Sequence, residues 1–215
     1  MLVAMAPKVT RSSARRQPKQ RRARQTVEAV LDAMVRVLKR EGSHAVTTNR
    51  IAEVAGVSIG SVYQYFPDKR AIFSALHQRH IQQMDRIVES TLVDHAASSL
   101  DELVGAMVEA VIDAHSPDPE LYELMGREVP HRADGTEHFA SRLHGALRLA
   151  ISAAMPELKK RGNLDKVVFV VAHMVDALCH GSVLRRPPSL SLADAKAESV
   201  RAILAYLHAA YLHAQ

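Results

Sequence analysis

Residues 47–70 read TTNRIAEVAGVSIGSVYQYFPDKR and predict two short helices joined by a tight turn. Thr47 or Thr48 can cap the first helix, because a hydroxyl there accepts a backbone N–H that has no partner inside the helix. Gly56 ends this helix, at a position that favours a left-handed backbone. Ser58 caps the second helix after a turn of about three residues. Helices joined by so short a turn cross steeply, as in the helix-turn-helix arrangement, whose second helix enters the major groove of DNA.

The outward side of the second helix is polar, small or aromatic, where an ordinary solvated helix more often carries Glu and Lys. We expect Pro67 in the first turn of the following helix, where its missing N–H costs nothing. Lys69 and Arg70 in that turn oppose the helix dipole, a conflict that a bound phosphate would resolve. The alternative is a helical hairpin that only packs. The pattern favours a DNA-reading element.

The stretch TTNRIAEVAGVSIGSVYQYFPDKRAI resembles the DNA-binding signature of the tetracycline-repressor-like (TetR) family of bacterial transcription regulators. The likeness runs from about Arg22 to Ile72, and the rest of the chain carries no comparable motif. The resemblance implies phosphate contacts from four side chains: Thr48, Tyr63, Tyr65 and Lys69. It implies that five residues approach the bases: Asn49, Ser58, Ile59, Gly60 and Ser61. The identity of any small-molecule effector stays open.

Composition fits a folded, helix-rich protein, because 47% of the 215 residues are apolar and only nine are glycine. No run of about 18 apolar residues occurs, so we predict no membrane-spanning segment. Residues 1–6 are too short an apolar start for a signal peptide. The single cysteine, Cys179, excludes an internal disulfide and fits the reducing cytoplasm, where we place the protein.

Positive charge is concentrated beside the helix-turn-helix. Residues 1–24 hold eight Lys and Arg and no acid, whereas residues 91–215 hold twelve basic and sixteen acidic residues. We predict that residues 1–21 form a disordered basic tail. Two interpretations of this tail stay open: it adds phosphate or minor-groove contacts, or it is only a solvated leader. A transit peptide has a similar composition, but the bacterial-type signature that follows argues against one.

The whole chain predicts an all-α protein of about nine helices in two folded domains. We assign residues 22–66 to a three-helix DNA-binding domain and residues 67–215 to a helical domain for ligand binding and dimerisation. Residues 67–93 form the helix that connects them. Apolar periodicity and Gly or Pro stops predict the remaining helices at 22–40, 100–115, 120–129, 136–155, 165–184 and 191–212.

The helix at 165–184 contains the most apolar stretch of the chain, residues 167–172. A helix that is apolar nearly all round is buried on more than one side. Together with the helix at 191–212 it can pair with its copy across a two-fold axis, as the TetR resemblance also implies. We therefore predict a homodimer with a four-helix interface, the alternative being a monomer that buries both helices in its own core.

His173, Asp176 and His180 fall on one helical stripe, with Cys179 beside them. They have the spacing to hold a metal or a polar ligand group, but such residues are more often buried polar groups that hydrogen-bond to one another. Adjacent helix residues point about 100° apart, which places His180 poorly as a base for a Cys179 thiol. The sequence also lacks a Ser-x-Gly elbow, a phosphate-binding glycine loop, HExxH and CxxC. We therefore predict no metal site, no cofactor and no catalytic site.

An apolar pocket for an unknown small ligand is assigned to seven side chains: Tyr122, Met125, Phe139, His144, Phe169, His173 and Met174. Each of these is equally well explained as a core residue. The sequence as a whole predicts a sequence-specific, DNA-binding transcription regulator that binds a palindromic operator as a dimer and is a repressor relieved by a ligand. The alternatives are a protein that coats DNA without sequence preference and, less favoured, a metal- or thiol-dependent helical enzyme.

Overall fold

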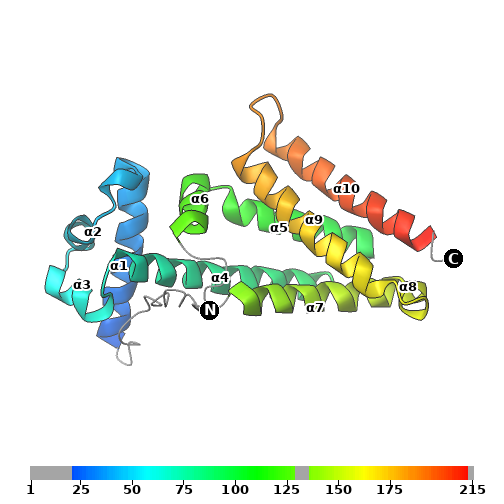
Figure 1. Cartoon of the computed structure of the whole chain (residues 1–215), viewed down its shortest axis with the longest axis horizontal. Coiled ribbons are helices and arrows are strands. Elements are labelled where there is room, and N and C mark those ends of the chain that lie inside the picture. Colours follow the sequence, from blue (N-terminus) through cyan, green and yellow to red (C-terminus); the bar gives the residue numbers. More distant parts are fainter. Residues whose placement is uncertain (1–20, 129–135, 213–215) are drawn as a thin grey trace, which may run out of the picture. The chain divides into compact units, whose positions relative to one another are not determined.

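The computed structural model describes residues 21–128 and 136–212, and the side chains of these residues outside 125–140 (Figure 1). These residues are almost entirely helical and contain no strand, which confirms the all-α prediction. Residues 1–20 of the predicted tail lie outside the described residues. The elements are α1 (Arg21–Glu41), η1 (Ser43–Ala45), α2 (Thr48–Ala55), α3 (Ile59–Tyr65), α4 (Lys69–Asp94), α5 (Leu100–His115), α6 (Pro119–Glu128), α7 (Thr136–Ala154), α8 (Pro156–Lys160), α9 (Leu164–Leu184) and α10 (Leu192–Leu212).

The described part of the chain has one α-helix more than the nine predicted. The additional helix is α8, which begins with Pro156 in its first turn and buries Leu158 completely. Proline is well suited to this position because the first turn needs no backbone donor. The sequence prediction treated this segment as the end of α7 and so missed the new start.

Helix α4 begins at Lys69, two residues later than predicted. The carboxylate of Asp68 accepts the backbone N–H of Ala71 at 2.9 Å and so caps the helix. Pro67 therefore precedes the cap and does not stand in the first turn. The Asp68 carboxylate also supplies negative charge beside Lys69 and Arg70, which lessens their conflict with the helix dipole.

Two compact units divide the chain, one containing residues 21–78 and 124–128 and the other residues 79–123 and 136–212. In the first unit, α1 packs against α2 and α3. The apolar side of α1 packs on the two short helices. The buried residues of these three helices are Val30, Leu31, Ala33, Met34, Val37, Leu38, Ile51, Ala52 and Val62.

The second unit has its core among α5, α7, α8, α9 and α10. Its buried residues are Val104, Val108, Ile112, Ile151, Met155, Leu158, Leu164, Val167, Val168, Val171, Val175, Cys179, Ile203 and Leu207. Most are aliphatic residues that recur at three- and four-residue spacing, which places them on one face of each helix.

Among the described helices, α9 alone is long and apolar enough to cross a membrane. Length and composition do not distinguish such a helix from one in a protein core. Val168, Val171 and Cys179 of α9 are almost fully buried among the neighbouring helices. Its position in this core accounts for its apolar character.

Candidate nucleic-acid interface

The turn between α2 and α3 is fixed by the three local signals that the sequence contains. The Thr47 hydroxyl accepts the N–H of Arg50 at 3.2 Å, and the Ser58 hydroxyl accepts the N–H of Ser61 at 3.0 Å. Gly56 ends α2 with a left-handed backbone, at φ 69° and ψ 30°. An L side chain would be strained there, so glycine is the natural residue for this turn. The predicted helix-turn-helix boundaries are confirmed to within one residue.

One face of α3 is packed and the other is open. Val62 and Phe66 are 0% and 1% exposed and hold the inner face against the first unit's core. The nine predicted DNA-contacting residues include no buried one. Five are exposed: Asn49, Ser58, Ile59, Gly60 and Tyr63. Four are partly exposed: Thr48, Ser61, Tyr65 and Lys69. The outward face of α3 is therefore free to enter a groove, which is what a recognition helix requires.

Gly60 has no conformational reason to be glycine. It lies within α3 at an ordinary helical φ, and a Cβ added there would meet only the Ser58 hydroxyl, at 3.8 Å. Glycine in a helix is less stable than alanine by about 0.5–1 kcal/mol. The fold would therefore favour a side chain at this position. A surface that comes close to α3 from outside gives a physical reason for having none.

Ser58 and Ser61 form a hydroxyl pair at the start of α3, with their oxygens 2.8 Å apart. Ser58 also caps the helix through the Ser61 N–H. Ser58 therefore stabilises α3, in addition to its predicted place near the bases. Ser61 has no such backbone role and keeps its hydroxyl on the open side of the helix.

Arg50 is a residue of this unit whose role the sequence pattern did not indicate. Its guanidinium lies 2.7 Å from a carboxylate oxygen of Glu41 at the end of α1 and 2.7 Å from Glu53 within α2. Its hydrogen bonds hold the pKa of Glu41 below its ordinary value. Glu53 lies three residues after Arg50 on the same helix, so helical spacing alone indicates that pair. Glu41 lies nine residues before Arg50, on another helix, and no local spacing indicates its contact. The pair fixes the start of α2 against α1.

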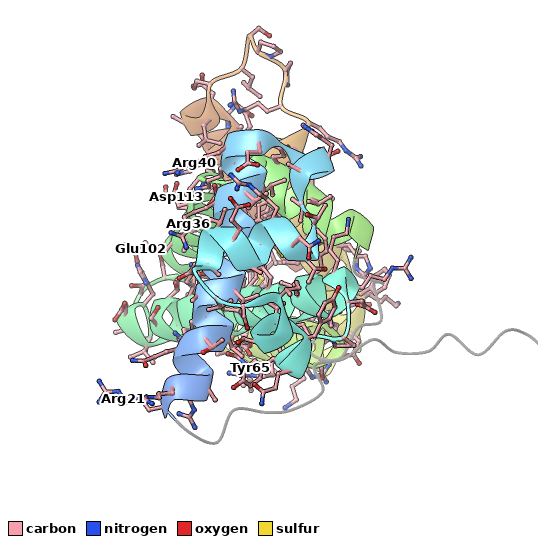
Figure 2. All side chains as sticks on the ribbon, turned by 90° about the vertical axis from the view of Figure 1, so that its left-hand side faces the viewer. Arg21, Arg36, Arg40, Tyr65, Glu102 and Asp113 are labelled. Carbon is pink, nitrogen blue, oxygen red and sulfur yellow. The ribbon has the colours of Figure 1, made fainter. Side chains whose placement is uncertain are left out.

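Further basic residues lie along α1, beside the two short helices. Figure 2 shows Arg21, Arg36 and Arg40 spread along α1, and Tyr65 at the end of α3. The Arg36 guanidinium donates to the carbonyl of Val54, at 3.4 Å, and so joins α1 to α2. The helix-turn-helix is thus packed against a helix whose first residues continue the basic character of the N-terminal sequence.

The structure describes the side chains of five of the seven predicted ligand-pocket residues. Phe169 and His173 are exposed on α9, their rings 4.2 Å apart between centroids. Tyr122 contacts His115 and His180, and His144 and Met174 are partly buried. The side chains of Met125 and Phe139 lie outside the described ones.

A small apolar cavity of about 30 Å³ lies elsewhere in the second unit. Its wall is entirely aliphatic or Met, with no polar surface. The lining residues are Leu92, Leu100, Leu103, Val104, Met107, Leu143, Ala146, Leu147, Ala150, Ile151, Val171 and Leu207. None of the seven predicted pocket residues is among them.

The stripe of His173, Asp176 and His180 does not form a metal centre. Within residues 21–128 and 136–212, no three side chains of His, Cys, Asp or Glu are arranged to hold an ion. The Cys179 thiol is 4% exposed, and burial raises its pKa to about 12. A thiol with so high a pKa is almost entirely protonated near neutral pH and is a poor nucleophile. Cys179 is a packing residue.

Residues 30–76 match the family described as "Bacterial regulatory proteins, tetR family". Residues 99–207 match "Tetracyclin repressor-like, C-terminal domain". The chain belongs to the TetR family. The match covers both the helix-turn-helix and most of the second unit, so the predicted resemblance is confirmed, and with it the prediction of a DNA-binding regulator.

Among its relatives is the nucleoid occlusion factor SlmA of Actinobacillus pleuropneumoniae, 31% identical over 74% of this chain and 79% of that protein. SlmA of Haemophilus ducreyi is 30% identical over 46% of this chain, and the match spans about half (48%) of that relative's length. YvkB of Bacillus subtilis, an uncharacterised HTH-type transcriptional regulator, is 35% identical over 32% of this chain and 36% of its own length.

Solved structures of transcriptional regulators share the fold at low sequence identity. A putative transcriptional regulator from Pseudomonas aeruginosa matches with a TM-score of 0.62 and 19% identity, over 92% of this chain and 93% of that one. A TetR-family regulator from Streptomyces coelicolor matches with a TM-score of 0.59 and 23% identity, over 85% and 98%. The TetR fold therefore extends over nearly the whole of this chain.

Proposed function

We propose that this TetR-family regulator is a homodimeric repressor that binds a roughly palindromic operator and is released by a small ligand. The open face of α3, with Gly60 exposed near the start of the helix, is the observation that supports sequence reading. Two such helices related by a two-fold axis would enter successive major grooves about 34 Å apart. The residues proposed to contact DNA are the nine predicted from the sequence.

The proposed dimer forms through α9 and α10. Phe169 and Leu212, large apolar residues of these helices, are 57% and 68% exposed. Further apolar residues of the two helices are only partly buried: Met174, Leu178, Val183, Val200, Leu204, Tyr206 and Tyr211. An exposed apolar surface on two packed helices suits a four-helix interface between copies. A two-fold axis would make the interface self-complementary.

The proposed effector site is the aliphatic cavity of the second unit. Pockets for drug-sized ligands measure roughly 300–1,000 Å³, so this cavity must widen to accept one. Its lining supplies no hydrogen-bonding group, which favours an apolar ligand. A ligand that favours the widened state by about 1–3 kcal/mol would lower operator affinity by about five- to 150-fold. That range is smaller than the usual gap between specific and non-specific DNA binding, about 4–10 kcal/mol.

Selection of binding sites from random duplex DNA by the purified full chain tests the proposal. We expect an inverted-repeat consensus whose half-sites are centred about 10 base pairs apart or slightly more. Affinity for the selected site should exceed that for a scrambled duplex by at least about a thousandfold at physiological salt. Retention of DNA without any consensus would contradict the repressor proposal and favour the DNA-coating alternative.

A second candidate function comes from the SlmA relatives, which are named for nucleoid occlusion. We propose it as the alternative in which operator-like sites are scattered over the chromosome rather than placed at promoters. Mapping of occupied sites in cells separates the two. A few sites beside promoters support the repressor, and many sites remote from promoters support the nucleoid role.

A further inference from the structure

Four aromatic side chains from four helices meet in the second unit. They are His80 of α4, His115 of α5, Tyr122 of α6 and His180 of α9. The ring centroids of His80 and His115 lie 4.8 Å apart, those of His115 and Tyr122 4.0 Å, and those of Tyr122 and His180 4.8 Å. His115 is 8% exposed. Neither the DNA contacts nor the aliphatic cavity includes any of the four.

The hydrogen bonds of His115 assign its tautomer. Its Nδ1 lies 2.7 Å from the carbonyl oxygen of Val111, and a carbonyl can only accept, so Nδ1 carries a hydrogen. In the neutral ring the other nitrogen, Nε2, then has a lone pair and no hydrogen. It lies 3.0 Å from Nε2 of His80. His80 must therefore donate, and a single hydrogen lies between the two rings.

The contact at the other end of the cluster tolerates a change of charge. The Tyr122 hydroxyl is 2.6 Å from Nε2 of His180, while Nδ1 of His180 donates to the backbone oxygen of Asp176 at 3.1 Å. A phenol donates to a neutral imidazole and accepts from a protonated one. The Tyr122–His180 contact survives either way. Two facing imidazole nitrogens cannot keep their hydrogen bond once both carry a hydrogen.

We propose that the His80–His115 contact is a proton-operated joint between α4 and α5, held by one shared hydrogen and opened when both rings are charged. The first proton, taken from solvent, leaves the contact intact, because an imidazolium donates to a neutral imidazole through a charge-assisted bond. The second proton places an N–H on both facing nitrogens. The hydrogen bond is then lost and two positive rings repel each other.

The groups around the joint set the direction of its response. Asp176 and His180 of α9 act on His115, and Tyr122 of α6 lies against it. Cys179 acts on Tyr122, and Arg185 acts on His180. Burial lowers the pKa of His115 below its ordinary value, and the charge of His180 lowers it further. The hydrogen bond to Asp176 raises the pKa of His180, so that ring is protonated first. Burial raises the pKa of both Tyr122 and Cys179, which stay neutral.

Opening therefore occurs as the pH falls below the ordinary histidine range, which centres on about 6.5. Helix α4 continues from this joint, without interruption, to Lys69 in the DNA-binding unit. If the joint holds α4 in the DNA-binding state, acid should weaken operator binding. This last step rests on the proposed operator function, whereas the joint itself does not.

The joint is tested by ¹⁵N NMR of the histidine rings in the full chain, with EDTA present to exclude metals. At about pH 7.5 we expect Nδ1–H with a bare Nε2 in His115, and Nε2–H in His80. On acidification the two rings should titrate as a coupled pair, in two steps. A protonated His115 Nε2 at about pH 7.5, or independent titration of the two rings, would overturn the proposal.

His80→Gln is the informative variant, because an amide can donate to a neutral His115 and accept from a protonated one. It should keep the α4–α5 contact and lose its acid sensitivity. His115→Gln removes the buried titrating ring and serves as a second test. His208→Gln is the matched control, since His208 is an exposed histidine of the same unit, paired with Asp101.

Operator affinity as a function of pH gives the functional readout. For each proton that the protein takes up when it releases the operator, Kd changes by up to about tenfold per pH unit. As the pH falls below about 6, we expect log Kd for the operator to rise more steeply for the wild type and His208→Gln than for His80→Gln. The slopes should differ by up to about one log unit per pH unit. Equal slopes for wild type and His80→Gln would overturn the coupling to DNA. Failure to bind any selected site at about pH 7.5 would contradict the proposed function instead, and the NMR result would still decide the joint.

Discussion

Arg50 of α2 donates hydrogen bonds from both Nη2 and Nε to the carboxylate of Glu41 at the end of α1, with Nη2–Oε1 and Nε–Oε2 distances of 2.7 and 2.9 Å. This two-point contact fixes the orientation of α2 as well as its position. Thr48 and Asn49, which immediately precede Arg50, are proposed to contact DNA. The ion pair therefore places the start of α2, although neither of its members belongs to the proposed contact set.

Glu41→Gln should lower the unfolding temperature of the chain at neutral pH but not in acid. The contact with Arg50 lowers the folded-state pKa of Glu41 below its unfolded value. Its contribution to stability is therefore present above the unfolded pKa, about 4.3, and is lost as the pH falls through the folded value. Thermal unfolding at several pH values measures this. The difference from wild type should be largest near neutral pH and should decrease as the pH falls below the unfolded pKa and through the lower folded-state pKa. Glu89→Gln, at an exposed position of α4, is the control, and a difference that persists in acid would contradict the assignment.

Ser58→Ala and Ser61→Ala should separate stability from sequence reading. Ser58→Ala removes the N-cap of α3, which typically costs about 1 kcal/mol. Ser61→Ala keeps the backbone N–H that Ser58 caps and removes the hydroxyl that pairs with that of Ser58. We expect urea unfolding to show the loss for Ser58→Ala alone, while site selection shows a changed consensus for Ser61→Ala and for Asn49→Ala. If both of the latter return the parental consensus, the proposed base contacts are wrong.

Gly60→Ala should stabilise the DNA-binding unit and weaken its binding to DNA. The added methyl has room within the protein, and alanine is favoured in a helix by up to about 0.5–1 kcal/mol. The same methyl would stand between α3 and a groove that approaches closely. Gly105→Ala is the matched control, because a Cβ there meets nothing within 4 Å. It should leave operator affinity unchanged. Undiminished affinity in Gly60→Ala would show that DNA does not come close to this position.

Sequence reasoning succeeded where the deciding contacts are local. Thr47, Gly56 and Ser58 each act within a few residues, and the helix ends that they predict are correct. The start of α4 was misplaced because the Asp68 cap was overlooked and Pro67 was read as the helix start. The Glu41–Arg50 pair and the histidine joint could not be predicted, since each depends on how separate helices pack. His80 and His115 are 35 residues apart, and no local spacing relates them.

Lys69→Ala should weaken binding to all DNA sequences by a similar factor. Lys69 opens α4, where its Nζ lies 5.8 Å from the centroid of the Phe73 ring, and it is proposed to contact a phosphate. Loss of one phosphate contact reduces the slope of log K against log salt by about 0.9. Titrations of operator and scrambled duplexes at several salt concentrations measure both effects. Lys166→Ala removes the same charge from an exposed position of α9 and should change neither the affinity ratio nor the slope. An unaltered salt slope in Lys69→Ala would remove Lys69 from the contact set.

Phe169→Glu should convert the proposed dimer to a monomer. Phe169 is 57% exposed on α9 and its ring lies tilted against that of His173, so in a lone chain it places an aromatic ring in water. An acid within an apolar interface would be buried without a partner, and the other protomer would carry the same additional charge. Sedimentation velocity should then show a single species of 23.7 kDa, whereas the wild type should show twice that mass. Operator affinity should fall with it, because two half-sites are no longer bound together.

Leu149→Glu is the matched control. Leu149 is an apolar residue that is 75% exposed on α7, outside the proposed interface, and its substitution should leave the dimer intact. A Phe169→Glu protein that sediments as the wild type does would place the dimer contact elsewhere on the molecule.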